Sequence, residues 1–460
     1  MSVHHNFFPL LLRRFPLHIV PIPAFRHGLL AVALFALTIA LGYFTPREQF
    51  VQLIALYGLF AGLYLLACRW SDAGTWPFYR QLGILLRLAL LFSVPGLSND
   101  VYRFIWDGRL LLQGVNPLLY TPLEWLESGK SVPGLDWTLF AKLNSGMNYT
   151  IYPPVAQAVF WLSCLPFSTG DWAPTVLMRA LLIAGEYGVL RLLPVLLPRF
   201  GYSPQRVVWY ALNPLIIMEI TGNLHFEGLM IFFLLWSMQS LLAGKMPRAA
   251  LAMSLSIATK LLPLMLLPFL LRRLNIGQNI RFFGLLGVLL ALMFLPMLGG
   301  GPVLAHFGNS LDLYFQQFEF NAGIYYIARW IGYRSTGYNQ IDAIGPTLAL
   351  CTTLYILLTA LWETSRRWED LPDRWLLAGS VYLFFAAIVH PWYLVMPIVL
   401  SLFTRRLFPL VWSALIFLSY IHYSYTPYRE NWYVLGLEYG LLAIFMTMES
   451  FLLRSDKPIS

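Results

Sequence analysis

The chain contains 460 residues, of which 58% are hydrophobic and 12% are charged, and its mean hydropathy is +0.64. Soluble domains carry about 25% charged residues, so this composition, with its repeated apolar runs of membrane-spanning length, excludes an ordinary soluble protein. The net charge of +9 is better explained by Lys and Arg residues that orient membrane helices than by nucleic-acid binding.

The apolar runs are predicted to be α-helices, because a bilayer core offers no water to backbone polar groups. They do not alternate as the strands of a transmembrane barrel do. Cys68, Cys164 and Cys351 lie within such runs. Three cysteines in these positions argue against a disulfide framework or a metal cluster.

The first three apolar runs cover roughly 28–44, 49–68 and 81–96. Arg13, Arg14 and Arg26 precede them without an obvious cleavage site, so we expect a retained N-terminus on the cytoplasmic side. Three crossings then place Asp100 outside.

The last third of the chain is oriented from its C-terminus, where Arg454 and Lys457 should be cytoplasmic. Six runs alternate back from there, at roughly 433–453, 407–423, 391–404, 375–389, 345–362 and 282–299. This order places His390 and Arg429 outside, on the same side as Asp100.

The middle of the chain is less regular. Runs at 206–220 and 226–243 place His225 and Glu227 outside. The stretch 249–271 is too short for two full spans and both its ends look cytoplasmic, so it predicts a short hairpin that contains Lys260.

The segment between Ile151 and Leu197 contains two apolar runs, but two membrane crossings there do not agree with the predicted orientation of the flanking segments. Of the runs at 153–168 and 174–196, one should therefore be partial or re-entrant. We predict an all-α polytopic protein of about 12–14 membrane helices. It forms one domain, 1–460, in which the external segments 97–151 and 301–344 make a small juxtamembrane helical layer.

The most unusual polar residues follow the third apolar run. Asp100, Arg103 and Asp107 have the spacing i, i+3, i+7, so a helix would carry them on one face. Tyr102 and Trp106 suit an interface-lying amphipathic helix. The structural alternative makes Asp100 an N-cap and Arg103–Asp107 a surface pair.

Other candidates lie at the outer ends of runs, and each has a structural alternative. Tyr152 and Gln157 open a run after a proline that can simply start a helix. His225 and Glu227 could bind phosphate or form an ordinary helix-end hydrogen bond. Aromatic residues near His390, such as Tyr393, are normal interface anchors.

Charged residues inside apolar runs are expensive and are functional candidates by default. Lys260 is one, and its hairpin favours a cavity over snorkelling to the surface. Arg87 is another, which could instead pair with a buried carboxylate such as Glu186 or Glu219. The sequence contains no Walker loop, Rossmann glycine fingerprint, HExxH motif or nucleophile elbow.

The segment Leu97–Tyr120, LSNDVYRFIWDGRLLLQGVNPLLY, resembles the first external loop of bacterial GT-C-type glycosyltransferases related to polyprenyl-phosphate-mannose-dependent mannosyltransferases. Shorter matching elements surround Tyr152, His225, Lys260, Asn321 and His390, so the resemblance spans most of the chain.

The resemblance implies that sugar moves from a lipid-phosphate donor at the outer membrane face with inversion at the anomeric carbon. Asp100 takes the position of the general base, and Asn99 stands where related sequences often carry a second acid. We expect Lys260 and Arg429 to bind phosphate. The other expected substrate-binding residues are Arg103, Asp107, Tyr152, His225, Glu227, Asn321, His390 and Tyr393.

The predicted function is therefore transfer of a sugar, mannose by preference, from a polyprenyl-phosphate donor to a lipid- or glycan-linked hydroxyl. No cofactor and no nucleic acid are expected, and a divalent metal stays open. The predicted location is a bacterial inner membrane, with both termini cytoplasmic, membrane lipids as partners and the active site external. Two alternatives stay open: a transporter or flippase of polyprenyl-linked glycans, and an O-antigen polymerase or ligase.

Overall fold

The computed structural model describes residues 25–298, 303–306, 308 and 318–455, and in this part of the chain it is all-α. Among these residues, only isolated β-bridges occur, one of them between Phe320 and Ile388. The predicted basic ends at Arg13, Arg14 and Lys457 lie outside the described residues. The three cysteines are free.

In the described part of the chain, six helices are long and apolar enough to cross a membrane, which makes this an integral membrane protein. They are α2 (Phe25–Phe44), α3 (Phe50–Trp70), α9 (Trp172–Leu196, continued by η1, Leu197–Phe200), α13 (Ile276–Leu298), α16 (Ile341–Trp362) and α20 (Trp432–Ser455). This number is below the predicted 12–14, because many of the predicted runs fold into shorter or broken helices.

The shorter elements lie in or beside the remaining predicted runs. They are α4 (Trp76–Ala89), η2 (Pro204–Arg206), α10 (Val207–Ala211), η3 (Ile216–Gly222, a π-helix), α11 (Glu227–Leu242), α12 (Met246–Thr259), η4 (Leu262–Leu270), η5 (Trp368–Asp370), α17 (Leu371–Phe385), η6 (Pro391–Leu394), α18 (Val395–Ser401), α19 (Phe408–Leu415) and η7 (Ile416–Ser424). The partial run between residues 151 and 197 is α8 (Pro154–Cys164), whose 11 residues are too few to span a bilayer.

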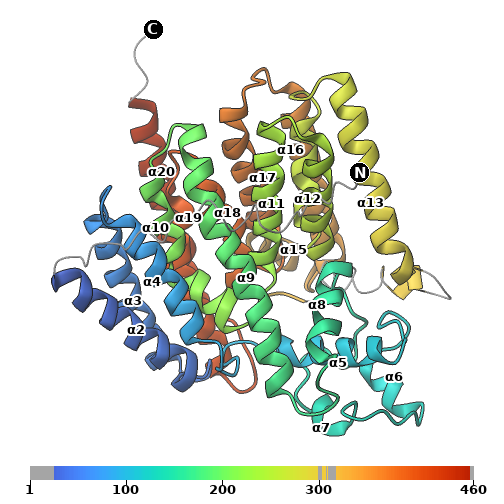
Figure 1. The fold of residues 1–460 in the computed structure, drawn as a ribbon. Coiled ribbons are helices and arrows are strands. Elements are labelled where there is room, and N and C mark those ends of the chain that lie inside the picture. Colours follow the sequence, from blue (N-terminus) through green and yellow to red (C-terminus); the bar gives the residue numbers. More distant parts are fainter. Residues whose placement is uncertain (1–24, 299–302, 307, 309–317, 456–460) are drawn as a thin grey trace, which may run out of the picture.

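A second hydrophobic core lies outside the main bundle. Helices α5 (Asp100–Leu112), α6 (Pro122–Glu127), α7 (Trp137–Phe140) and α8 group together at one end of the bundle, at the lower right of Figure 1. The end of α13 contacts this group, because the Asn116 amide donates a 2.6 Å hydrogen bond to the Met297 carbonyl. We call this end of the molecule the site end. Helix α15 (Ile324–Thr336) packs beside α16 and α17.

The hairpin predicted at 249–271 is present, with α12 and η4 as its two arms. Ser256 donates a hydrogen bond to the Met230 carbonyl and Ser237 donates one to that of Ala249, so α12 runs antiparallel to α11. Helix α12 ends at Thr259, and η4 leads back to the start of α13. Lys260, in extended conformation, is therefore the tip of the hairpin.

Arg87 forms the buried ion pair that the sequence suggested. Its Nε lies 2.9 Å from Glu186 on α9, and both side chains are almost fully buried. The guanidinium also donates to the Ala211 carbonyl at 2.7 Å. Gly83 allows this approach, since a Cβ there would lie 2.5 Å from the same carbonyl oxygen.

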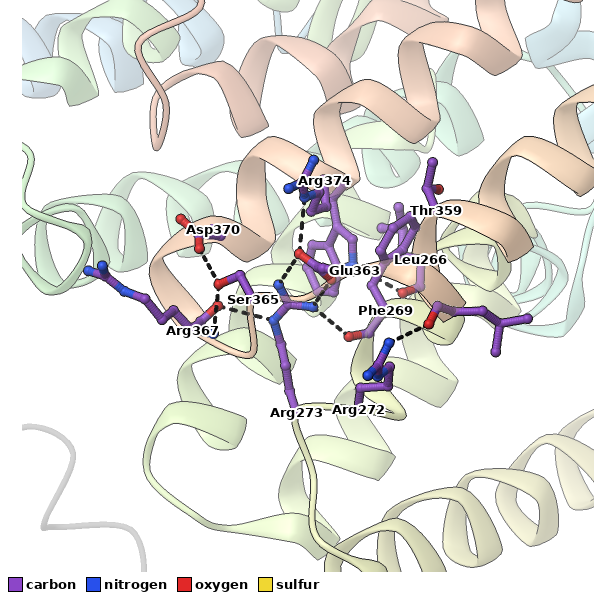
Figure 2. A network of polar contacts seen from close by, with 12 residues as sticks. Leu266, Phe269, Arg272, Arg273, Thr359, Glu363, Ser365, Arg367, Asp370 and Arg374 are labelled. Atoms are coloured by element: carbon purple, nitrogen blue, oxygen red, sulfur yellow. Dashed lines mark hydrogen bonds and ion pairs between the residues drawn. The ribbon is translucent and has the colours of Figure 1, made fainter. Parts of the chain in front are cut away.

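The opposite end of the bundle is held by a network around Glu363 (Figure 2). Arg273 donates two hydrogen bonds to this carboxylate, at 2.7 and 2.8 Å, and Arg374 donates a third at 3.0 Å. Arg273 also donates to the Phe269 carbonyl at 2.8 Å. The network therefore fixes the base of η4 against α16 and α17.

Candidate active site

Asp100 is the first residue of α5, and its side chain is 19% exposed. Asn99, not Asp100, occupies the N-cap position, so the proposed capping role for Asp100 is wrong. The Asn144 amide donates a 2.8 Å hydrogen bond to Asp100 Oδ1, and the Tyr152 hydroxyl lies 3.5 Å from Oδ2. His225 Nε2 lies 3.8 Å from Oδ2. The Asp100 carboxylate is therefore held from two sides while one edge stays open to solvent.

Arg103 and Asp107 form a buried pair, so the surface-pair interpretation is also wrong. Arg103 Nε lies 2.8 Å from Asp107, and the guanidinium donates to the carbonyls of Ser145 and Asn148. The other Asp107 oxygen accepts hydrogen bonds from Thr150 at 2.5 Å and Gln157 at 2.9 Å.

This Arg103–Asp107 pair lies within the α5–α8 layer, where it holds the segment between Asn144 and Tyr152. Its hydrogen bonds join it to this segment and to Gln157, so it supports the residues that contact Asp100.

Three aromatic rings stack beside Asp100. The Trp392 ring lies between those of His225, at a centroid distance of 3.7 Å, and His390, at 4.3 Å. His225 Nδ1 is 3.0 Å from the Glu219 carbonyl, which favours the proton on Nδ1 and turns Nε2 toward Asp100. Burial lowers the pKa of His390 to about 3, so this ring is neutral at physiological pH.

Lys260 and Glu227 complete the site. Helix α11 bends away from η3 by 105°, which places Glu227 in its first turn opposite the hairpin tip. Lys260 Nζ lies 3.1 Å from Glu227 and 5.4 Å from the centre of the Tyr152 ring. Because Tyr152 also reaches Asp100, the two charged groups flank the same tyrosine.

Three of the predicted residues do not take part in the contacts around Asp100 and Lys260. Tyr393 contacts the His390 ring at 5.5 Å. Arg429 is exposed, with its guanidinium 4.4 Å from the centre of the Tyr425 ring. Asn321 is buried and donates to Glu438 at 3.2 Å, in a separate polar cluster.

A short bridge connects Asn321 to the stacked rings. The Phe320 amide donates to the Ala387 carbonyl at 3.0 Å, and the Val389 amide donates to the Phe320 carbonyl at 2.8 Å. The Phe320 ring lies 4.5 Å from that of His390. Asn321 is therefore one residue away from a segment that packs on the site.

Sequence reasoning missed Asn144, which contacts Asp100, and Arg47, which packs on Tyr423. Asn144 carries no sequence signal, since it is a polar residue in a polar loop. Arg47 lies between α2 and α3, where its guanidinium is 4.5 Å from the centre of the Tyr423 ring and its backbone amide donates to the Gly96 carbonyl. An arginine in a short loop predicted to be external runs against the usual charge bias, and this signal could have identified it.

Within the described part of the chain, no three His, Cys, Asp or Glu side chains are grouped so that they could hold a metal ion. The available chemistry comes from one carboxylate with an open edge, a lysine–glutamate pair and two stacked imidazoles. A carboxylate in this setting can accept a proton, and a lysine beside it can stabilise developing negative charge.

Comparison with known proteins identifies the family. The model for the alpha-(1→6)-mannopyranosyltransferase N-terminal domain, the MptA/B family, matches residues 18–274, which is more than half of the chain and includes Asp100, His225, Glu227 and Lys260. Alpha-(1→6)-mannopyranosyltransferase A of Mycobacterium tuberculosis (strain H37Rv) is 25% identical over 182 residues, 39% of this chain and 34% of that protein. The aligned part thus spans about a third of that relative's length. The resemblance seen in the sequence is confirmed, and the chain belongs to the alpha-(1→6)-mannopyranosyltransferase family.

Proposed function

We propose that the protein transfers mannose from a polyprenyl-phosphate donor to a hydroxyl group of a lipid- or glycan-linked acceptor, with inversion at the anomeric carbon. The observation that carries this proposal is the open-edged carboxylate of Asp100, which lies beside Tyr152 and His225 and close to Lys260. Family membership supports mannose as the transferred sugar.

The reaction needs a base, a nucleophile and a leaving group in one place. Asp100 accepts the proton of the acceptor hydroxyl as its oxygen bonds to the anomeric carbon. The bond between that carbon and the donor phosphate breaks, and its electron pair leaves with the polyprenyl phosphate. The result is one glycoside, one polyprenyl phosphate and a protonated Asp100.

Lys260 is the cation best placed to stabilise the leaving phosphate. Its ammonium is already paired with Glu227, so the phosphate would share the lysine with that carboxylate. His225 can donate from Nε2 only when the ring is protonated. Arg429, exposed on the Tyr425 ring, is a second candidate phosphate ligand.

The charge distribution supports an external site. Six arginines lie in or next to the loops at the end opposite Asp100: Arg272, Arg273, Arg366, Arg367, Arg374 and Arg406. Basic residues mark the cytoplasmic side of membrane helices, so this end is proposed to face the cytoplasm of a bacterial inner membrane. Asp100 would then open to the outside.

The test uses the purified chain in detergent with mannose-labelled polyprenyl phosphate and an acceptor glycan. Label should move to the acceptor, and inversion should appear in the anomeric configuration of the product. Translocation of a lipid-linked glycan in proteoliposomes without any transfer of label would contradict the proposal.

A further inference from the structure

A fully buried arginine lies between the two chain segments that carry the active-site residues. Arg179 is on the membrane-spanning helix α9. Its Nε and one Nη donate hydrogen bonds to the carbonyls of Thr221 and Gly222, at 2.8 and 3.0 Å. The other Nη donates to the carbonyls of Leu91 and Ser93, at 2.9 and 2.5 Å. This one side chain therefore connects three parts of the fold.

The four carbonyls lie at the ends of two helices. Thr221 and Gly222 are the last residues of η3, whereas Leu91 and Ser93 lie just after the end of α4. Carbonyls at the end of a helix lack a partner within it and carry partial negative charge. The buried Arg179 guanidinium satisfies both sets, so it holds the end of α4 against the end of η3.

Both helix ends lead directly into the active site. From Ser93 the chain continues to Asp100, the first residue of α5. From Gly222 it continues through His225 to Glu227, the first residue of α11. Asp100 Oδ2 and His225 Nε2 lie 3.8 Å apart. This separation depends on how the two segments are held together.

A second link joins the same two segments. The Leu97 amide donates a 3.0 Å hydrogen bond to Oδ1 of the buried Asn223, whose side-chain amide donates to the Met218 carbonyl at 2.9 Å. Leu97 is three residues before Asp100, and Asn223 is two residues before His225. The link therefore lies next to the site.

We propose that Arg179 is a positioning residue for mannose transfer, which sets the separation of Asp100 from His225 without contacting the substrate. This role rests on the proposed function, in which Asp100 is the general base. The planar guanidinium directs its donors toward both segments, whereas a lysine ammonium is one point of charge on a flexible chain. Without these donors the segments can shift, and a shift of about 1 Å at the reacting groups can lower the rate roughly 10²-fold.

The test is a double-mutant cycle of Arg179→Lys and Asp100→Asn, measured as mannose transfer by the full-length protein in detergent. Alone, Arg179→Lys should lower kcat by about 10²-fold and change the KM for the donor by less than about twofold. The KM should hold because Lys260, the proposed phosphate ligand, lies at the tip of a separate hairpin. In the Asp100→Asn protein the same substitution should lower kcat by at most about threefold, since the base that it misplaces is already absent.

Arg206→Lys is the matched control. Arg206 also donates to two backbone carbonyls, those of Leu402 and Thr404, at 2.9 and 2.6 Å. These carbonyls lie beside the loop of Arg406, at the opposite end of the bundle. Arg206→Lys should lower the unfolding temperature, as Arg179→Lys does, but should keep the kcat of wild type.

Asn223→Ala provides the same test if Arg179→Lys does not fold. It removes the acceptor of the Leu97 amide and should lower kcat about fivefold, in the range of one hydrogen bond. This decrease should again require Asp100.

An equal decrease in kcat with and without Asp100, in whichever of the two variants folds, would overturn the proposal. A residue that serves only stability lowers the active fraction by the same factor in both backgrounds. An unchanged kcat in folded Arg179→Lys would also overturn it. Failure of the proposed function is a different result, in which folded wild type transfers no mannose from the polyprenyl-phosphate donor, and the positioning role then fails with it.

Discussion

The two ends of the helical bundle both bury charged side chains, but the central carboxylate of one end is fully paired while that of the other is not. Both Glu363 oxygens accept hydrogen bonds from arginines. At the site end, neither Glu227 oxygen accepts a hydrogen bond of good geometry, and His225 Nε2 and His390 Nδ1 are also buried without one. Unsatisfied buried polar atoms are costly, so they persist where a ligand completes them.

The comparison separates two kinds of buried charge in this protein. The Glu363 network and the Arg103–Asp107 pair connect backbone segments and leave few polar atoms unused. Around Asp100 and Lys260, hydrogen-bond acceptors and donors that lack a well-formed hydrogen bond lie next to one another. We expect substitutions in the Glu363 network and the Arg103–Asp107 pair to change stability. We expect substitutions around Asp100 and Lys260 to change turnover.

Asp100→Asn should have the largest effect. Loss of a general base typically lowers kcat by about 10²–10⁴-fold, and the amide preserves the size of the side chain. The measurement is initial mannose transfer, with the unfolding temperature in detergent as the check on folding. Asp342→Asn is the matched control, because Asp342 is also an acidic residue in the first turn of its helix, α16, and is exposed. If Asp100→Asn is as active as wild type, Asp100 is not the general base.

Glu363→Ala should have the largest effect on stability. Removing one partner of a buried ion pair costs about 3–5 kcal/mol, and here Arg273 would be left fully buried without its carboxylate. Thermal unfolding should show a clear decrease, while the folded fraction should keep its KM. Glu369→Ala removes an exposed pair with Arg367 and should change little. A stable Glu363→Ala protein with poor turnover would reverse the roles of the two ends.

Lys260→Met tests whether the Lys260–Glu227 pair is more than a structural link. The single substitution should lower kcat by roughly 10²–10³-fold, because a donor to the leaving phosphate is lost, and it should also destabilise the protein by leaving Glu227 unpaired. Adding Glu227→Gln should recover the unfolding temperature without recovering turnover. If the double variant recovers both, Lys260 serves only to neutralise Glu227.

Asn144→Ala should have the smallest effect of the four. Its amide donates a 2.8 Å hydrogen bond to Asp100, but Asn144 is exposed and water can replace it. We expect a decrease in kcat of about fivefold to tenfold, or about 1 to 1.4 kcal/mol, which is in the range of an ordinary net hydrogen bond. Asn148→Ala is a suitable control, since the Asn148 contact with Arg103 uses its backbone carbonyl. A decrease of the size expected for Asp100→Asn would make Asn144 essential to the site.

Much of the helical pattern could be predicted from hydrophobic runs alone. The predicted boundaries of α2, α9, α11 and α16 lie within a few residues of the observed ones, because long apolar runs in a bilayer have few alternatives to a helix. The need of Arg87 for a buried carboxylate followed from the cost of an unpaired charge at membrane depth.

The breaks within runs could not be predicted in the same way. The run at 206–220 becomes α10 and a π-helix, and Leu224 adopts a φ of 60° where the chain bends before α11. Backbone conformations of this kind depend on tertiary contacts, such as those that the Arg179 guanidinium makes with the carbonyls of Thr221 and Gly222. These irregular backbone conformations bring Glu227 next to Lys260. The family resemblance could therefore indicate both residues, but it could not predict that they contact each other.

The hairpin with Lys260 at its tip has a consequence for what the enzyme can modify. Its arm α12 contains 14 residues and rises about 21 Å, which is less than the ~30 Å hydrocarbon thickness. In the proposed orientation Lys260 therefore lies below the external surface of the bilayer, so an acceptor hydroxyl must enter the membrane to meet a donor phosphate held there. A sugar in the interior of a stiff polymer cannot easily do so, whereas a free terminus can. On this proposal we expect the enzyme to extend a glycan at its end in preference to branching along its length.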